Sequence, residues 1–213
     1  MSKHQIQPLQ YITHGSPEEQ IQQAKDACEA GIRWIQLRLK NVNDLTLLKA
    51  ALEVKAICTE YNAVFIVNDH VHIALAADAD GVHLGKEDST PKDARILLGP
   101  DKIIGGTSNT LEDIVELAAA QVDYIGLGPY RFTSTKQNLS PILGVRGFQE
   151  IIKRMAGLEK SIPLIAIGGI LPEDIPELKS IGVHGIALSS ALILAKNRKE
   201  MVTSIMKYDV KNR

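Results

Sequence analysis

Short apolar segments and helix-compatible segments alternate eight times along the 213 residues, and this alternation constrains the fold more than any other feature. The apolar segments have few polar interruptions, as is typical of parallel strands buried on both faces. Strands that alternate with helices predict a parallel sheet covered by helices, an α/β fold. The expected strands are Leu9–Thr13, Trp34–Leu39, Val64–Val67, Gly81–Leu84, Ile103–Gly106, Tyr124–Leu127, Leu164–Ile167 and Gly185–Leu188.

The segments between these strands carry helix start and stop signals. Ser16 before Pro17 is typical of an N-cap, and Gly31 and Gly182 are typical of residues that end helices. Eight strand–helix units predict a closed (β/α)8 TIM barrel. An open doubly wound sheet is the alternative, but the chain has no Gly-x-Gly-x-x-Gly phosphate loop. The expected helices include Pro17–Ala30, Asp44–Glu60, Leu111–Ala120, Val145–Met155, Pro172–Ser180 and Ser190–Lys207.

Composition narrows the class of protein. The balance of 24 basic and 25 acidic residues lacks the basic excess of a nucleic-acid binder. No apolar run approaches the roughly 18 residues of a membrane span, so we expect no membrane partner. We expect one compact domain over residues 1–213, with residues 1–8 and 207–213 as tails, and the sequence allows a homo-oligomer.

The two cysteines bear on the compartment. Cys28 and Cys58 are thirty residues apart, and each falls in a helical pattern. Buried free thiols are the favoured interpretation, with a disulfide as the alternative. The N-terminal segment Met1–Gln10 is polar and lacks a signal-peptide core. Together these features predict a cytoplasmic location.

In a TIM barrel the active site lies where the strands end, so the end of the second strand is informative. Gln36, Arg38 and Lys40 alternate with aliphatic residues and therefore share one face of an extended chain. Cations that point into a barrel need an anionic partner. Paired carboxylates could supply it, but Arg and Lys at a barrel mouth suit phosphate oxygens better.

The third and fourth strands are each followed by an acidic residue. Asp69 comes after Asn68, and Asp88 follows the fourth strand. Mg²⁺ in proteins commonly takes one or two carboxylates together with substrate phosphate oxygens. Either aspartate could instead cap a helix, beginning near Val71 or at Pro91. Two acids beside Arg and Lys favour a metal-bridged phosphate.

Small and hydroxyl residues follow the later strands. Gly168–Gly169 and Ser189–Ser190 come after the seventh and eighth strands, whose loops often form a phosphate site in this fold. Tight turns that require glycine are the alternative. Gly105–Thr110 more commonly indicates helix capping than phosphate binding, and Thr133–Lys136 suits either phosphate or an ordinary surface loop.

The histidines give weaker evidence about the site than the residues above. His70 and His72 lie beside Asp69, but their spacing across a helix start is weak support for a metal pair. His83 falls on a strand and is equally compatible with a structural role. His14 could approach the barrel mouth, whereas His184 should lie at the start of a strand, away from it. The residues thus predict two anion sites at one barrel mouth.

An ordered set of motifs resembles the thiamine-phosphate synthase family, also called thiamine-phosphate pyrophosphorylases. The resemblance extends from about Tyr11 to Ala195, and no single motif carries it. The motifs are Gln36-Leu-Arg-Leu-Lys40, Val67-Asn-Asp69, Gly81-Val-His-Leu-Gly-Lys-Glu-Asp88, Gly126-Leu-Gly-Pro129, Thr133-Ser-Thr-Lys136 and Ala166-Ile-Gly-Gly-Ile170.

The resemblance implies a TIM barrel that joins a pyrimidinylmethyl diphosphate to a thiazole phosphate, giving thiamine phosphate and diphosphate. Its mechanism would be dissociative, with Mg²⁺ on Asp69 and Asp88, and with Arg38, Lys40 and Lys136 as catalytic residues that stabilise the leaving group. The pyrimidine diphosphate would be held by Gln36, Leu37, Arg38, Leu39, Lys40, Asn68, Thr107 and Lys136. The thiazole phosphate would be held by Thr133, Ser134, Thr135, Gly169, Ser189 and Ser190.

The chain departs from the family pattern at three places. Thr107 stands where serine is usual, Lys86 replaces a common glutamine and adds charge near Asp88, and Tyr130-Arg131-Phe132 replaces an aromatic-proline run. Other functions remain as alternatives. These are a thiazole tautomerase, which would not need the acid pair, a sugar-phosphate epimerase or isomerase, and a non-catalytic binder of thiamine precursors.

Overall fold

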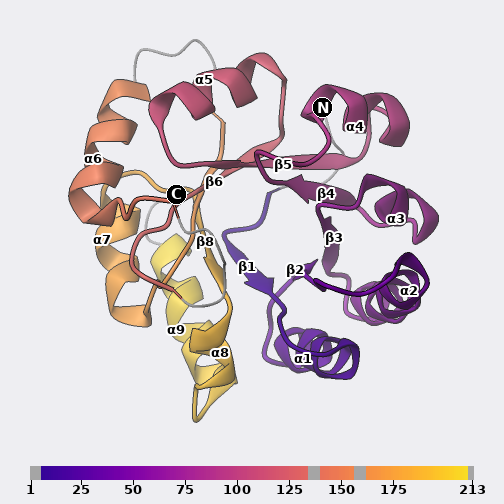
Figure 1. The fold of residues 1–213 in the computed structure, drawn as a ribbon. Coiled ribbons are helices and arrows are strands. Elements are labelled where there is room, and N and C mark those ends of the chain that lie inside the picture. The colour runs from indigo at the N-terminus through magenta and orange to yellow at the C-terminus, as the bar shows by residue number, and fades with distance from the viewer. Residues whose placement is uncertain (1–5, 134–139, 156–161, 211–213) are drawn as a thin grey trace.

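The computed structural model describes residues 6–133, 140–155 and 162–210. Within them, eight parallel strands pair in sequence order and close into a barrel, with β8 hydrogen-bonded to β1 (Figure 1). The predicted (β/α)8 architecture is confirmed, and the open-sheet alternative is wrong. The strands are β1 Leu9–Ile12, β2 Trp34–Leu37, β3 Val64–Asn68, β4 Gly81–Leu84, β5 Ile103–Ser108, β6 Tyr124–Leu127, β7 Leu164–Ala166 and β8 Gly185–Leu188.

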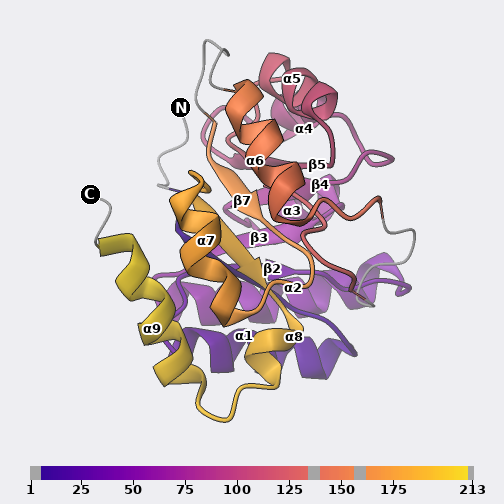
Figure 2. The ribbon, with the colours of Figure 1, turned by 90° about the vertical axis from the view of Figure 1, so that its left-hand side faces the viewer.

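Helices cover the outside of the barrel, and Figure 2 shows α6, α7 and α9 along one flank. They are α1 Pro17–Glu29, α2 Asp44–Glu60, α3 Val71–Ala76, α4 Pro91–Leu98, α5 Leu111–Ala119, α6 Gly144–Met155, α7 Ile175–Ser180, α8 Ser190–Ile193 and α9 Arg198–Val210, with a 3₁₀ turn at Pro172–Asp174. In the described part of the chain, none of these helices has both the length and the apolar character needed to cross a bilayer.

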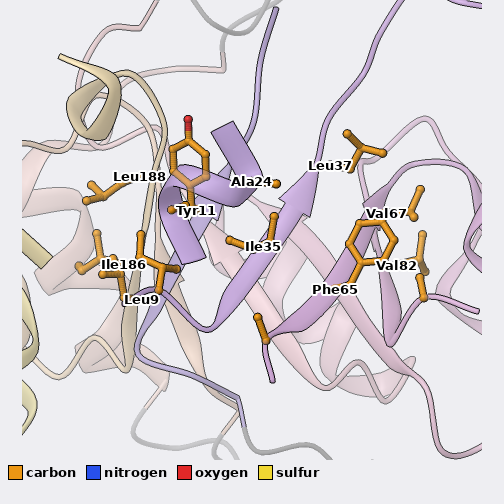
Figure 3. Close-up of a cluster of buried hydrophobic side chains, with 14 of the residues drawn as sticks. Leu9, Tyr11, Ala24, Ile35, Leu37, Phe65, Val67, Val82, Ile186 and Leu188 are labelled. Atoms are coloured by element: carbon orange, nitrogen blue, oxygen red, sulfur yellow. The ribbon is translucent and has the colours of Figure 1, made fainter. Parts of the chain in front are cut away.

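Side chains alternate between the barrel interior and the helices, as the period of two along each strand requires. Trp34 and Tyr124 lie in the interior cluster, and their rings meet edge to face at 4.8 Å. The other faces of the strands pack against helices, where Ile35 and Leu37 are fully buried (Figure 3). The polar face of β2 therefore points inward, as predicted.

Local signals in the sequence explain where several helices begin. The Ser16 hydroxyl accepts the Glu19 N–H, and the Glu19 carboxylate accepts the Ser16 N–H, which completes a capping box at α1. Thr110 and Asp113 form the same motif at α5. Each box satisfies N–H groups that the first helical turn leaves unpaired. Cys28 and Cys58, on α1 and α2, are buried free thiols, as expected.

The long C-terminal helix expected at Ser190–Lys207 is wrong. The segment is divided into α8 and α9, because Asn197 starts a new helix. The Asn197 side chain accepts the Glu200 N–H and donates to the Glu200 carboxylate, a reciprocal cap. The helix α9 then continues to Val210, so residues 207–210 are helical rather than part of a tail.

Candidate active site

The residues after β2 bring two cations to the mouth of the barrel. Gln36 is buried inside the barrel at 2% exposure, but β2 ends at Leu37, so Arg38 and Lys40 belong to the following loop rather than to the strand. Burial lowers the pKa of Arg38, and the negative charge of Asp69 opposes that effect. A guanidinium remains protonated under these conditions and can attract an anion.

The backbone of Arg38 is held by buried polar groups that sequence reasoning missed. Thr13 accepts the Arg38 N–H at 3.2 Å, and the Gln20 amide donates to the Arg38 carbonyl at 3.2 Å. Thr13 and Gln20 are themselves joined at 2.6 Å. Gln20 lies on the buried face of α1, where a polar residue is uncommon, and that position was the available signal.

Leu37 and Leu39 lie on the other side of this segment. Both side chains are buried in the helix-facing cluster, at 0% and 4% exposure. If Leu37 and Leu39 contact a substrate, they therefore do so through their backbone groups.

Asp69 is placed by a strained turn at the end of β3. Its φ is 65°, in the left-handed region that non-glycine residues rarely occupy, and its N–H donates to the His83 carbonyl at 2.8 Å. The Asp69 carboxylate forms an ion pair with Lys40. The residue before α3 is His70, whose side chain makes no capping bond, so Asp69 does not serve as the cap of that helix. Strain of this kind is concentrated at functional sites.

Asp88 lies on the next loop and faces Asp69. It accepts the Gly85 N–H at 2.7 Å, whereas Thr90 caps α4. Burial, together with the neighbouring Asp69 carboxylate, raises the pKa of Asp88. Two carboxylates held against their mutual repulsion, with oxygen donors only, fit a hard divalent cation.

A series of hydrogen bonds between polar side chains crosses the barrel interior below this acid pair. His83 contacts the Thr107 hydroxyl through Nε2 at 3.0 Å and the Tyr124 hydroxyl through Nδ1 at 3.0 Å. Gln10 donates to Tyr124, and Gln36 donates to Gln10. Thr107 is the next-to-last residue of β5, not a loop residue after it. The network joins Gln36 and Thr107, two residues expected to hold the pyrimidine, and within it His83 bridges Thr107 and Tyr124.

The loop after β8 carries Ser189 and Ser190, which the sequence assigns to the second anion site. The Ser189 hydroxyl donates to the Ile12 carbonyl at 2.7 Å and lies 3.1 Å from Nδ1 of His14. His14 therefore does reach the mouth. Ser190 begins α8 and is exposed. Because β7 and β8 pair, the loop at Gly168–Gly169 leaves the barrel beside Ser189.

Hydrogen bonds from Arg131 to Asp174 and to Gly169 hold the loop at Gly168–Gly169 in position. The Arg131 guanidinium makes two hydrogen bonds to the Asp174 carboxylate, at 2.8 and 2.9 Å, and a third to the Gly169 carbonyl at 2.7 Å. Gly169 has a φ of 67°, and an added Cβ would lie 2.7 Å from the Phe132 carbonyl oxygen. Only glycine fits that approach. The family departure at Arg131 thus serves to hold the loop.

Asp174→Asn should destabilise the protein by about 1–3 kcal/mol at neutral pH. Burial acts to raise the pKa of Asp174, but the bonds from Arg131 and from the Leu171 N–H outweigh it and lower the pKa below its usual value. The carboxylate therefore stabilises the fold above about pH 4, and this contribution is lost as pH falls through the folded pKa. Chemical denaturation of both proteins at pH 7 and pH 3 checks this. An equal difference in the free energy of unfolding between the two proteins at both pH values would contradict this prediction.

Lys86, another departure, forms an ion pair with Asp113 at 2.7 Å. Asp113 also accepts N–H groups at the start of α5, so the charge of Lys86 is directed toward that helix rather than toward Asp88. Thr133 lies at the edge of the described segment, and Ser134, Thr135 and Lys136 lie outside the described residues. Their predicted roles remain predictions.

Comparison with known proteins agrees with this geometry. Residues 9–192 match the family model described as thiamine monophosphate synthase. The chain belongs to this family. Its relatives named thiamine-phosphate synthase include one from Flavobacterium psychrophilum, 43% identical with 93% of this chain and 97% of the relative covered. Another, from Bacteroides fragilis, is 45% identical with 93% and 98% covered.

A solved structure is also similar. The thiamine phosphate pyrophosphorylase from Pyrococcus furiosus superposes with a TM-score of 0.81 at 31% identity, covering 96% of each chain. Membership of this family makes the chain a transferase of thiamine biosynthesis, and the resemblance seen in the motifs is confirmed.

Proposed function

We propose that this enzyme joins a pyrimidinylmethyl diphosphate to a thiazole phosphate and releases diphosphate. The observation that carries the proposal is the acid pair Asp69–Asp88 beside Arg38 and Lys40 at one side of the mouth. Carboxylates and cations placed together suit a polyanion bound through a metal. The family's synthase activity agrees with that site.

Asp69 and Asp88 would hold Mg²⁺. When bound, the ion would offset negative charge on the diphosphate oxygens. Arg38 would hold the same oxygens from a half-buried position, where its charge interacts more strongly than it would in water. Lys40, now paired with Asp69, would reach the diphosphate from the exposed side.

The pyrimidine would sit over the interior network. Gln36 and Thr107 offer an amide and a hydroxyl to the ring, and Asn68 ends the adjacent strand. The C–O bond to the diphosphate breaks, and its electron pair leaves with the diphosphate. The lone pair of the thiazole nitrogen then forms the new C–N bond. No protein nucleophile is needed, so the protein contributes orientation and charge stabilisation.

The thiazole phosphate would occupy the neighbouring loops. Gly169, Ser189 and Ser190 lie after adjacent strands, with Ser189 oriented by Ile12 and His14. A second anion subsite at the same mouth brings the two substrates together in one orientation, which is the main advantage that an enzyme can give a two-substrate reaction. The tautomerase alternative does not account for the acid pair.

The partners and the location follow from the same proposal. Small phosphorylated molecules are the substrates that two anion subsites fit. We keep the cytoplasm as the expected location, supported by the buried free thiols Cys28 and Cys58.

An assay by phosphorus NMR tests the function. Purified protein with both substrates and Mg²⁺ should produce thiamine phosphate and diphosphate in equal amounts over many turnovers. EDTA should stop both products, and excess Mg²⁺ should restore them. Folded protein that forms neither product contradicts the proposal, and equal rates with EDTA contradict the metal assignment alone.

Thr107→Val should lower kcat/KM for the pyrimidine diphosphate by about 10–100-fold, because the hydroxyl that faces His83 is lost. Thr107→Ser keeps a hydroxyl and is the matched control, expected to stay within a few-fold of wild type. Steady-state kinetics with the thiazole phosphate saturating measures both. Equal losses in the two variants would show that the hydroxyl is not the important group.

A further inference from the structure

A second group of metal-ligating side chains lies outside the substrate site. Asp44, His70 and His72 each offer one ligand atom, and these atoms all lie within 4.8 Å of one another. We propose that they form a binding site for a borderline divalent transition metal such as Zn²⁺. The site is separate from the Asp69–Asp88 pair and does not depend on the proposed function.

The three ligand atoms lie near enough to one another to share one ion after small side-chain movements. Nε2 of His72 lies 3.0 Å from Oδ2 of Asp44, and the rings of His70 and His72 are 5.8 Å apart at 81°. Zn²⁺ binds nitrogen and oxygen ligands at about 2.0–2.2 Å, so tetrahedral donor atoms lie about 3.3 Å apart. Small rotations of the exposed Asp44 and His72 side chains and of the half-buried His70 side chain would bring the three donor atoms to that separation.

The backbone holds the three residues in fixed positions. Asp44 is the first residue of α2, which Asn43 caps through the Thr46 N–H at 2.9 Å. His70 precedes α3, and its N–H donates to the Asn68 carbonyl at 2.8 Å, across the strained turn at Asp69. This turn directs the Asp69 carboxylate toward Lys40. The helices α2 and α3 lie side by side on the barrel (Figure 1).

The chemistry of the donors selects the metal. Two imidazoles and one carboxylate suit Zn²⁺, Ni²⁺ or Cu²⁺, whereas Mg²⁺ prefers oxygen ligands alone. Exposure of 57% for the His72 side chain and 69% for that of Asp44 leaves water free to complete the coordination. An ordinary ion pair between His72 and Asp44 is the competing interpretation. Such exposed pairs contribute at most about 1 kcal/mol and would not require His70.

Zn²⁺ titration of the metal-free full-length protein tests the proposal. Calorimetry is run with millimolar Mg²⁺ present, so that the Asp69–Asp88 pair does not compete. We expect one Zn²⁺ per chain, with Kd raised at least tenfold in His70→Ala and in His72→Ala. Co²⁺ in place of Zn²⁺ should give visible absorption that both variants lose.

His184→Ala is the matched control, because His184 is exposed and contacts the Ile6 carbonyl away from this group. It should keep the wild-type Kd. Thermal unfolding confirms that each variant is folded. Unchanged Zn²⁺ affinity in both folded variants, or equal loss in the control, would overturn the proposal.

Discussion

Asp69→Asn will lower kcat by roughly 10²–10³-fold, as expected when charge stabilisation of a leaving group is removed. Asparagine tolerates the left-handed conformation, so the turn with φ of 65° should survive the change. The free energy of unfolding should therefore stay within about 1 kcal/mol of wild type. Steady-state assays and urea denaturation measure the two quantities.

Asp78→Asn is the control for this experiment. Asp78 also has a positive φ, 47°, and also pairs with a lysine, Lys102, but it follows α3 at the opposite end from the mouth. Its turnover should remain near wild type. Near-wild-type turnover in folded Asp69→Asn would remove Asp69 from the proposed site.

Arg38→Gln will reduce kcat by about 10²-fold. Burial lowers the pKa of Arg38, which means that the fold bears a cost for keeping this charge at the mouth. Glutamine removes the charge while keeping a polar side chain, so stability should not fall. A catalytic loss without a stability loss is typical of residues that are kept for function.

Arg33→Gln supplies the comparison. Arg33 precedes β2, at the opposite end of the strand, and donates to the Cys28 and Ile32 carbonyls at 2.8 Å. We expect Arg33→Gln to lower the free energy of unfolding by about 1 kcal/mol and to leave kcat unchanged. If Arg33→Gln and Arg38→Gln lowered kcat equally, the assignment of Arg38 to the leaving group would be wrong.

The barrel could be predicted because apolar strands and helical segments alternate regularly, and because caps such as Ser16 and Thr110 mark where several helices begin. Tyr124–Leu127 and Gly185–Leu188 agree with the structure residue for residue. The ends of strands are less predictable where the chain stays extended beyond the last hydrogen bond to the neighbouring strand. Trp34–Leu39 alternates throughout, yet pairing with β3 ends at Leu37.

The grouping of Lys40, Asp69 and Asp88 could be predicted because these residues follow strands, whose carboxyl ends meet at one mouth. Its supporting contacts could not. Arg131 and Asp174 are 43 residues apart, and only the fold brings them together. His83 looked equally structural or functional, since its partners Thr107 and Tyr124 lie on two other strands. Similarly, Asp44 lies on α2, so the sequence around His70 did not indicate a third ligand.

A crystal structure with Mg²⁺, an unreactive analogue of the pyrimidine diphosphate and the thiazole phosphate would show where both substrates bind. We expect one barrel mouth to hold the two phosphorylated substrates at two adjacent subsites. The diphosphate should lie between Arg38, Lys40 and the acid pair, and the thiazole phosphate should lie against Gly169 and Ser189. Either substrate bound away from these residues, or a metal bound without Asp69 and Asp88, would contradict this expectation.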